Sequence, residues 1–558
     1  MQLMPALRLL LFTGLLYSAA CVIAAEPGPP AAGAAASPAS LPLPSDEELE
    51  AAGARIGAIE FRQLQIFDLN DPADRNWLFR TADRLHAGTR LSAIRAQLLF
   101  RTGDRYSRRL LQETERNMRR RSNFLREPTI RPIRYHDGVV DIEVTTQDTW
   151  TLQPGINFSR SGGTNSSGID VADSNFLGYG KYAEAGHSED VDRHYTYLNW
   201  ADPNVWGTHW TDSVQYSDDS DGTIWGVAGA KPFFSLETPM DYGVDGGATH
   251  AVIPRYALGR QYDAYDFYNQ SADLYFGDAL LISDLWTERL VVGWRVDRNR
   301  FTAAPNTALL APLPQDRDLS FPFTRMQWVE NTYETMRDLD LIARTEDVHF
   351  GLDASVGLGW ATPAFGADRS SLLADTEINY GWRFGLDHQL FLTSRLASRF
   401  EDGRMRDAIL TGTARTYFAT SDRSRFLLRF SGDAGHNLDG DHTLELGGDT
   451  GLRGYPLRYQ NGNQRALLTI EERLYTNWYL LRLVNVGAAA FYDMGRTWGT
   501  TLVPTPQLGL LKDAGVGLRL GNSRAAFGSV IHIDLATPLD VEPGISRLQF
   551  LVSTQSSF

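Results

Sequence analysis

Leu446-Gly-Gly-Asp-Thr-Gly-Leu-Arg-Gly-Tyr455 is the stretch from which the organisation of this chain follows. Its four glycines in ten residues give a backbone that can bend where side chains would block it. About forty residues later, Asp493 lies in the apolar and aromatic stretch Phe491-Tyr-Asp-Met-Gly495. An arginine on a flexible loop, here Arg453, and a carboxylate on a strand can form a charge-assisted, bidentate pair. Such a pair requires the loop to fold back into an enclosed space, which the rest of the chain must supply.

The region from Thr146 to Phe558 predicts this enclosure. In it, segments of alternating apolar and polar residues are separated by clusters of Gly, Asp, Asn, Ser and Pro. In Arg425–Asp433 one face is apolar and the other mostly polar, and Ala514–Asn522 repeats the pattern with glycines on its charged face. A strand of this kind suits a barrel in lipid with a wet lumen. It also suits a soluble sandwich whose polar face meets solvent. Recurrent Trp and Tyr near the strand ends favour the barrel, because they are typical of membrane interfaces.

The length of this region predicts the number of strands. At roughly 25 residues for each strand and its connection, it would form about sixteen antiparallel strands. Beyond the N-terminus the sequence has no apolar run long enough for a helical membrane span, which takes about 18 residues or more. We therefore expect a mainly β fold, with a transmembrane barrel of about sixteen strands over residues 147–558 and a small α/β domain before it.

The N-terminal segment Met1–Ala25 is typical of a secretory signal peptide, with an apolar centre and small residues before the cleavage point. The competing interpretation is a lipoprotein signal in which Cys21 is acylated. Ser18 stands where such signals usually carry an aliphatic residue, which favours ordinary cleavage. Residues 26–52 are rich in proline and alanine and predict a disordered linker. Cys21 is the only cysteine, so cleavage would leave no thiol for catalysis or metal binding.

Residues 53–146 predict the small α/β domain. We expect a strand at Ile56–Phe67, helices at Leu91–Phe100 and Ser107–Arg121, and a hairpin that joins Thr129–Tyr135 to Val139–Thr145. The second helix is strongly basic in a protein whose net charge is −15. Its arginines are Arg108, Arg109, Arg116, Arg119, Arg120 and Arg121. We favour a solvated helix face, a common pattern where acids are interspersed, over docking against anionic lipid or an acidic partner.

The small domain resembles a POTRA (polypeptide-transport-associated) domain, most closely in Gln97–Tyr106 and Gly138–Val144. The barrel region resembles the BamA/TamA-type outer-membrane assembly family, and the resemblance covers about residues 55–558. The motifs follow the order of that family: Asn175-Phe-Leu-Gly-Tyr-Gly180, Ala201-Asp-Pro-Asn-Val-Trp-Gly207, Lys231-Pro-Phe-Phe234, Gly447-Gly448, Leu452-Arg-Gly-Tyr455, Thr469-Ile-Glu-Glu-Arg473, Phe491-Tyr-Asp-Met-Gly495 and the terminal Phe558. Each motif is weak alone, and the ordered set is specific.

The resemblance implies a role for the glycine-rich loop. Leu452, Arg453, Gly454 and Tyr455 would reach into the barrel lumen, where Arg453 would contact Asp493 and a nearby acid, for which Glu471 is the candidate. Alternation places Glu471 and Arg473 on one strand face. The loop would lock the barrel, shape the path of a polypeptide, or do both.

The end of the chain resembles the C-terminal signal that the assembly machinery of outer-membrane barrels recognises. Phe558 lies in register with Phe550 and Val552 on the last predicted strand. An ordinary apolar chain end is the alternative interpretation.

No motif indicates an enzyme, a metal site or a cofactor. Gly521-Asn-Ser-Arg-Ala525 lacks the final glycine of a nucleophile elbow, and Asp218-Asp-Ser-Asp-Gly222 lacks the closing glutamate of a calcium loop. The net charge of −15 argues against a nucleic-acid partner.

The resemblance implies a factor of the cell outer membrane, with the POTRA-like domain in the periplasm, that inserts or exports polypeptides without a chemical energy source. Its partners would be outer-membrane lipid and lipopolysaccharide, unfolded outer-membrane or secreted polypeptides, and periplasmic or lipoprotein components. The alternative is a gated pore or surface-exposed barrel with no assembly role. The sequence leaves open whether the client is a protein or a lipid.

Overall fold

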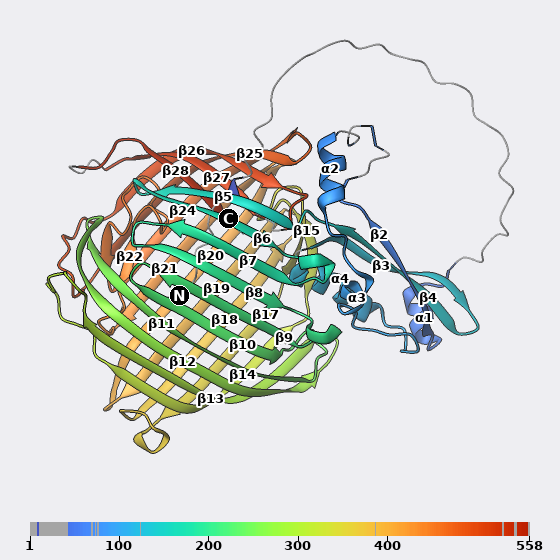
Figure 1. The fold of residues 1–558 in the computed structure, drawn as a ribbon, viewed down its shortest axis with the longest axis horizontal. Coiled ribbons are helices and arrows are strands. Elements are labelled where there is room, and N and C mark those ends of the chain that lie inside the picture. The colour runs from blue at the N-terminus through green and yellow to red at the C-terminus, as the bar shows by residue number, and fades with distance from the viewer. Residues whose placement is uncertain are drawn as a thin grey trace, which may run out of the picture.

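The computed structural model shows a large barrel with a small α/β domain at one end (Figure 1). It describes residues 8–9, 43–67, 71–72, 74, 77–122, 124–385, 387–526, 529–540 and 544–555. The signal peptide expected at Met1–Ala25, apart from Arg8–Leu9, most of the linker and the terminal Phe558 lie outside these residues. We call the barrel end that carries the α/β domain the near end, and the opposite end the far end. No helix among the described residues is long and apolar enough to cross a membrane.

The barrel has twenty antiparallel strands and not the expected sixteen or so. In chain order they are β5 (Leu152–Ser161), β6 (Thr164–Asp173), β7 (Tyr182–Glu189), β8 (His194–Asp202), β9 (Thr211–Asp219), β10 (Gly222–Lys231), β11 (Met240–Ala257), β12 (Arg260–Ile282), β13 (Trp286–Ala303), β14 (Arg317–Glu330), β17 (Leu352–Ala361), β18 (Ser371–Phe384), β19 (His388–Glu401), β20 (Arg404–Ser421), β21 (Ser424–His436), β24 (Gln464–Leu480), β25 (Val484–Trp498), β26 (Leu511–Asn522), β27 (Val530–Pro538) and β28 (Gln549–Gln555). The prediction was wrong because β5 to β10 have only 8 to 10 residues each and several tight turns join them.

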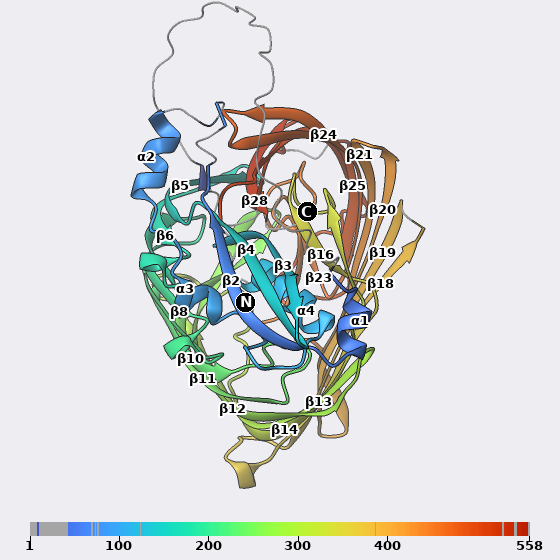
Figure 2. The same cartoon turned by 90° about the vertical axis from the view of Figure 1, so that its right-hand side faces the viewer.

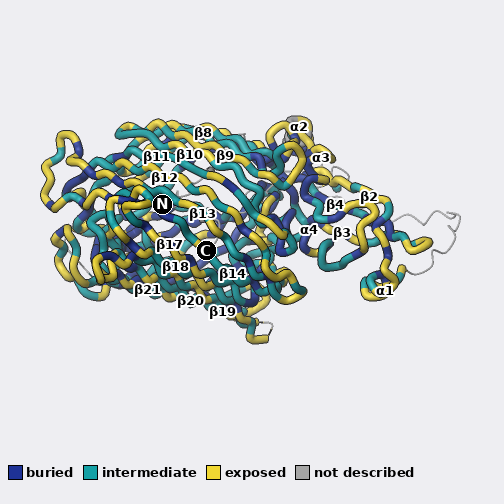
Figure 3. The backbone as a smooth tube through the Cα atoms, turned by 90° about the horizontal axis from the view of Figure 1, so that it is seen from below, coloured by how far each residue is buried: buried dark blue, intermediate teal, exposed yellow. Residues whose placement is uncertain are grey.

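The strand alternation separates an outer apolar face from an enclosed inner face. On β26, Val516 and Leu518 point outward and are 58% and 48% exposed, whereas Arg519, the next residue along the strand, points inward and is 1% exposed. Exposed and less exposed positions also alternate along stretches of other barrel strands, such as β6 (Figure 3). Because a continuous exposed apolar surface is unfavourable in water, this outer face fits a lipid environment.

The barrel closes through a weak seam between its first and last strands. Within the described residues, β28 and β5 share one register pair, Val552 with Arg160. By contrast, β27 and β28 pair continuously from Val530–Gln555 to Ala536–Gln549. The two-residue strand β1 (Arg8–Leu9) lies against β5 at Ile156 and Asn157.

The N-terminal α/β domain has the predicted strand, two helices and two strands in that order, together with two further helices. Its elements are α1 (Asp46–Ala51), β2 (Arg55–Leu64), α2 (Trp77–Leu85), α3 (Leu91–Arg95), α4 (Arg108–Arg121), β3 (Leu125–His136) and β4 (Val139–Asp148). Helix α1 lies within residues 26–52, where a disordered linker was expected, because its Leu49 is buried in the core of the domain. The sheet order is β2-β4-β3, with β2 parallel to β4. Ser107 caps α4 by accepting a hydrogen bond from the backbone N–H of Leu110. Leu111 and Met118 on α4 pack against Ile142 of the sheet in one core.

The basic helix α4 docks on the near end of the barrel, so the expectation of a solvated face was wrong. Arg119 donates a bidentate pair of hydrogen bonds to Asp347, at 2.8 and 2.7 Å. Asn117 donates to the carbonyl of Phe234, and Glu113 accepts from the backbone N–H of Leu236. The sequence could not show this, because the partners come from connections between barrel strands more than a hundred residues away.

Connections at the near end that carry family-like motifs also hold the α/β domain. Two short 3-10 turns, η1 (Phe176–Gly178) and η2 (Val205–Gly207), follow β6 and β8. Asn175 before η1 donates to Thr89, and Asn204 before η2 donates to the carbonyl of Ala96. These asparagines therefore join the first barrel strands to the domain. A third 3-10 turn, η3 (Pro363–Phe365), lies at the far end.

Candidate functional site

The glycine-rich stretch lies in a long connection between β21 and β24, residues 437–463, which we call the luminal loop. The short strands β22 (Leu444–Leu446) and β23 (Gln460–Gly462) pair at its base. The loop turns inward, because the residues it contacts lie on the inner faces of β24 to β27. Leu452 and Tyr455 are fully buried and pack with Leu446 and Leu511.

Arg453 reaches two acids on neighbouring strands. Its Nε donates to Oδ2 of Asp493 at 2.7 Å and its Nη2 to Oδ1 at 3.1 Å, while its Nη1 donates to Oε2 of Glu471 at 3.1 Å. The structure thus brings together Arg453, Asp493 and Glu471, the three charged residues singled out in the sequence. The guanidinium also lies 3.3 Å from the ring centroid of Phe491. The side chain of Asp493 is 0% exposed and that of Glu471 4%, so both charges depend on buried partners.

The neighbours of Arg453 in the loop have separate roles. Gly454 passes so close to β26 that a Cβ atom there would lie 2.6 Å from the Cβ of Asp513, which explains the need for glycine. The Tyr455 hydroxyl donates to the carbonyl of Lys512 at 3.0 Å. Leu452 fills the apolar cluster described above. The four residues therefore provide the charge, the close approach and the anchors of one turn.

The pair is part of a larger group, which we call the central cluster. Its members are Arg453, Glu471, Arg473, Asp493, Arg519 and Asp534. Arg519 donates to Asp534 at 2.5 Å and to Glu471 at 3.3 Å, and Arg473 donates to Glu471 at 3.0 Å. Arginines and acids are equal in number, so the cluster is neutral as a whole when all are ionised. Replacement of one member leaves a buried charge without its partner.

Sequence reasoning missed Arg519 and Asp534 as members of the cluster. Alternation already placed Arg519 on the charged inner face, between Gly517 and Gly521. A buried arginine between glycines was the available signal. Its partner on β27 could not be found, because strand register is set by pairings that the sequence does not show.

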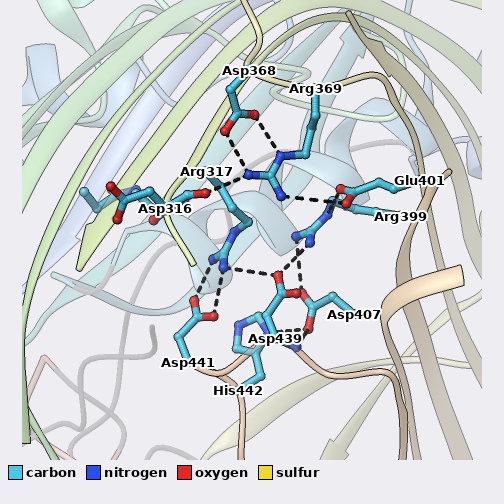
Figure 4. Close-up of polar contacts among 12 residues, drawn as sticks. Asp316, Arg317, Asp368, Arg369, Arg399, Glu401, Asp407, Asp439, Asp441 and His442 are labelled. Atoms are coloured by element: carbon cyan, nitrogen blue, oxygen red, sulfur yellow. Dashed lines mark hydrogen bonds and ion pairs between the residues drawn. The ribbon is translucent and has the colours of Figure 1, made fainter. Parts of the chain in front are cut away.

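A second group, the far-end cluster, holds the first residues of the luminal loop against the barrel wall (Figure 4). It consists of Asp316, Arg317, Asp368, Arg369, Arg399, Glu401, Asp407, Asp439, Asp441 and His442. Arg317 on β14 donates a bidentate pair to Asp441, at 2.9 and 2.6 Å. Arg399 on β19 donates to Asp439 at 2.6 Å. These contacts tie the loop to two strands of the wall.

His442 adds a titratable contact to the far-end cluster. Its Nδ1 lies 2.7 Å from Oδ1 of Asp407 on β20. The hydrogen bond to Asp407 raises the pKa of His442 above its usual value, and nearby Asp441 adds to the rise. The protonated imidazole is therefore favoured where the loop meets β20.

The other end of the luminal loop is tied to the opposite wall. Arg458 donates to both carboxylate oxygens of Asp192, in the turn between β7 and β8, at 3.1 and 2.7 Å. Tyr256 near the tip of the β11–β12 hairpin donates to the same carboxylate, and Asn461 donates to the carbonyl of Tyr256. The loop therefore spans the far end of the lumen from wall to wall.

The residues of the predicted C-terminal signal are only partly described. Phe550 is 41% exposed, and Val552 is 7% exposed and pairs with Arg160 across the seam. Phe558 lies outside the described residues. The assembly signal therefore stays a prediction.

No protein-family model matches the chain, and no curated protein matches it. Solved structures do. CdiB from Acinetobacter baumannii is 12% identical with a TM-score of 0.42, covering 90% of this chain and 73% of its own. CdiB from Escherichia coli is 15% identical with a TM-score of 0.46, covering 90% and 76%. BamA from Haemophilus ducreyi lacking POTRA domains 1–3 is 15% identical with a TM-score of 0.37, covering 89% and 85%.

The similar solved structures are CdiB and BamA barrels, and at TM-scores of 0.37 to 0.46 the BamA/TamA-type family stays a prediction from the sequence. Because the identities are only 12% to 15%, this likeness concerns the fold alone.

Proposed function

We propose that this chain is an outer-membrane assembly or translocation factor of the BamA/TamA type, which inserts or exports polypeptides without a chemical energy source. In this proposal the near end faces the periplasm, and the N-terminal α/β domain acts as a POTRA domain. The lipid-facing wall contacts outer-membrane lipid and lipopolysaccharide. The process requires no catalytic group, because strand pairing itself supplies the driving force.

The observation that carries the proposal is the seam between β28 and β5. Among the described residues, one register pair, Val552 with Arg160, joins β28 to β5, and β1 pairs with β5 at Ile156 and Asn157. By contrast, β28 pairs continuously with β27, and β5 pairs continuously with β6. Unpaired backbone N–H and C=O groups at membrane depth are costly, so an edge of this kind favours the addition of another strand. A client strand that pairs with β5 would satisfy those groups.

The α/β domain offers a first docking place for an extended client. The strands β2 and β3 form the two edges of its sheet, and an extended peptide can add to a sheet edge by β-augmentation. The contacts of Asn175 and Asn204 with the domain hold it beneath the first barrel strands, beside the seam. A client bound at the domain would thus lie close to the strand that it joins.

The rival function is a gated pore. It predicts a lumen that opens to ions, whereas the luminal loop spans the far end of this lumen and is held by Arg458 and Arg317. A large, steady conductance of the purified protein in planar bilayers would favour the rival. The assembly proposal predicts little steady conductance.

The direct test is to lock the seam. The substitutions Arg160→Cys and Val552→Cys place two thiols at a register pair of the seam, with Cys21→Ser removing the native cysteine. A matched control locks β20 to β21 with Thr413→Cys and Ser431→Cys, whose hydroxyls are 3.4 Å apart in the wild type. Cells would carry each variant as the sole copy.

We expect the oxidised seam lock to lower the amounts of client proteins in the outer-membrane proteome, and a reductant to restore them. The control disulfide should have no such effect. Unchanged levels and folding of every other barrel, in the seam-locked strain and after depletion of the protein, would refute the assembly proposal. A changed lipid composition with unchanged proteins would instead identify a lipid client.

A further inference from the structure

One connection at the near end contains two short strands of its own, unlike the other near-end connections among the described residues. Between β14 and β17, residues 331–351 form a hairpin of β15 (Tyr333–Arg337) and β16 (Thr345–His349). Figure 2, which views the molecule from the near end, shows β16 within the ring of barrel strands. We call residues 338–344, which join β15 to β16, the hairpin tip.

The hairpin packs its apolar side chains on the inner wall of the barrel. Leu339, Val348 and Phe350 form a buried cluster with Tyr417 of β20 and Leu427 of β21. These wall residues lie on the inner face, since Phe418 and Phe430, which alternation places on the opposite face of the same strands, are exposed. The hairpin therefore occupies the near end of the lumen, as the luminal loop occupies the far end.

Ile342 at the tip enters a space that glycines leave open. It packs with Val530 of β27 and Tyr475 of β24. A Cβ atom added to Gly521 would lie 2.9 Å from the Cβ of Ile342, and one added to Gly487 would lie 3.5 Å from its Cδ1. The wall is thus shaped to receive a branched apolar side chain at this position.

The wall also binds the backbone and one acid of the tip. Arg473 donates to the carbonyl of Leu339 at 3.1 Å. The Tyr417 hydroxyl donates to Asp340 at 2.7 Å, and Arg415 lies 3.5 Å from the same carboxylate. A peptide-binding surface combines such features: a donor to a main-chain carbonyl, a cation beside one acid, and an apolar slot.

The tip holds its shape through groups of the hairpin itself. The carboxylate of Glu346 accepts hydrogen bonds from the backbone N–H groups of Leu339, Asp340 and Leu341, at 2.9 to 3.2 Å. The contacts of the wall are therefore made to a segment that arrives already folded. A hairpin of this kind can leave the wall as a unit without unfolding the barrel strands.

Contacts link this surface to both functional regions. Arg473 binds Glu471 as well as the tip, and Glu471 binds Arg453 of the luminal loop. On the other side, Arg119 of α4 holds Asp347 on β16, and Arg116 lies 4.0 Å from the ring centroid of Tyr333 on β15. The hairpin therefore connects the α/β domain to the central cluster.

We propose that the inner wall around Tyr417, Leu427, Arg473 and Tyr475 is a binding site for a segment of client polypeptide, and that the hairpin tip is its built-in competitor. The ligand is a short peptide with branched apolar side chains beside an acidic residue, as in Leu339-Asp340-Leu341-Ile342. The identification of the ligand as a client rests on the proposed function. A client segment that makes the same contacts can displace the tip, because its contacts with the wall replace those that the tip loses.

Peptide binding to the purified full-length protein tests the site without reference to assembly. The probe is a fluorescent peptide with the sequence of Asp338–Arg344. The variant Leu339→Ser with Ile342→Ser weakens the hold of the tip, and a heat-modifiable gel shift shows that its barrel is folded. We expect this variant to bind the probe at least about tenfold more tightly than the wild type does.

A matched probe carries lysine at the position of Asp340, which Arg415 should repel. We expect it to bind at least about tenfold more weakly than the first probe. Equal binding of the first probe to wild type and variant, or equal binding of both probes to the variant, would overturn the proposed site.

A tether tests whether the tip must leave. Ile342→Cys with Gly521→Cys, in the Cys21→Ser background, places the two Cβ atoms close enough for a disulfide after a small shift. We expect oxidation to abolish crosslinking of clients to the inner wall and to stop client assembly, and reduction to restore both. Each single cysteine variant controls for the substitution itself.

The outcomes separate the two proposals. If clients are fully assembled while the tether is oxidised, the proposed role of the tip is overturned. The assembly function is still tested separately by the seam lock. A chain that binds the peptide as expected but assembles no client would retain the site and refute the proposed function.

Discussion

The luminal loop and the β15–β16 hairpin fill opposite ends of one lumen, but they are held in different ways. The loop is held by charge, through the buried pair of Arg453 with Asp493 and the bidentate contacts of Arg317 and Arg458. On the barrel wall the hairpin is held mainly by apolar packing, with one acid and a few backbone contacts at its tip. The difference suggests a division of roles. A network of buried charges is costly to open, whereas an apolar hairpin can be exchanged for another apolar segment.

The largest expected effect is at the loop. Arg453→Ala removes the guanidinium that pairs with Asp493 and leaves that fully buried acid without its arginine. We expect the free energy of unfolding to fall by about 3–5 kcal/mol, the usual cost of breaking a buried pair. Urea unfolding of the purified barrel, followed by the heat-modifiable gel shift, measures it.

A double-mutant cycle sharpens this prediction. Asp493→Ala should have a similar effect, and the combined variant should lose less than the sum of the two. If the two losses simply add, Arg453 and Asp493 do not interact and the loop is held by its other contacts.

The second effect concerns how closely the loop approaches the wall. In Gly454→Ala the new methyl group would meet the Cβ of Asp513 at 2.6 Å and the backbone nitrogen of Pro538 at 3.0 Å. Overpacking of this kind costs about 1–3 kcal/mol. The same unfolding assay measures it. Gly412→Ala on β20, where a methyl group meets nothing within 4 Å, is the matched control and should change stability little.

The sequence predicted the loop and not the hairpin, and the reason is physical. Arg453 stands out because a lone arginine among glycines needs a partner, and Asp493 stands out because an acid in an apolar strand needs a cation. The hairpin residues Leu339 and Ile342 look like any short apolar turn, since their partners are set by strand register across the barrel.

The same limit applies to the fold. Alternation correctly assigned the inner and outer faces of β21 and β26, because a period of two is a local property. The predicted number of strands was too low. Tight turns such as the one at Gly162 make the connections shorter than the prediction assumed, and they interrupt the alternation too little to mark where one strand ends and the next begins. The docking of α4 was also missed, because Arg119 has its partner Asp347 on a distant connection.

A smaller effect is expected at the hairpin. Tyr417→Phe removes the hydrogen bond to Asp340 and keeps the ring, while Arg415 still faces the carboxylate. We expect a loss of about 1 kcal/mol that is confined to the hairpin. Hydrogen exchange of residues 338–344 should become faster, and the barrel strands should be unchanged. Equal loss of protection in the strands would show that the hairpin is an inseparable part of the wall, as the loop is.

The smallest effect is a dependence of the loop on pH. His442 has a folded-state pKa raised by Asp407, so its protonated form stabilises the attached loop. That contribution is fully present below the unfolded pKa of histidine, about 6.5, and is lost as the pH rises through the higher folded value.

Protease cleavage in residues 437–443 should therefore increase as the pH is raised through this window. The side chain of His442 is 44% exposed, so the change should be modest. Asp407→Asn keeps the shape of the partner and removes its charge, and it should flatten the pH profile. A profile that persists in Asp407→Asn would assign the effect to other groups, and the ties through Arg317 and Arg399 would then set the far end of the loop without help from His442. The hairpin makes no contact with His442 among the described interactions. In either case its hydrogen exchange should therefore show no matching change with pH. The same pH series thus compares the two ends of the lumen in one experiment.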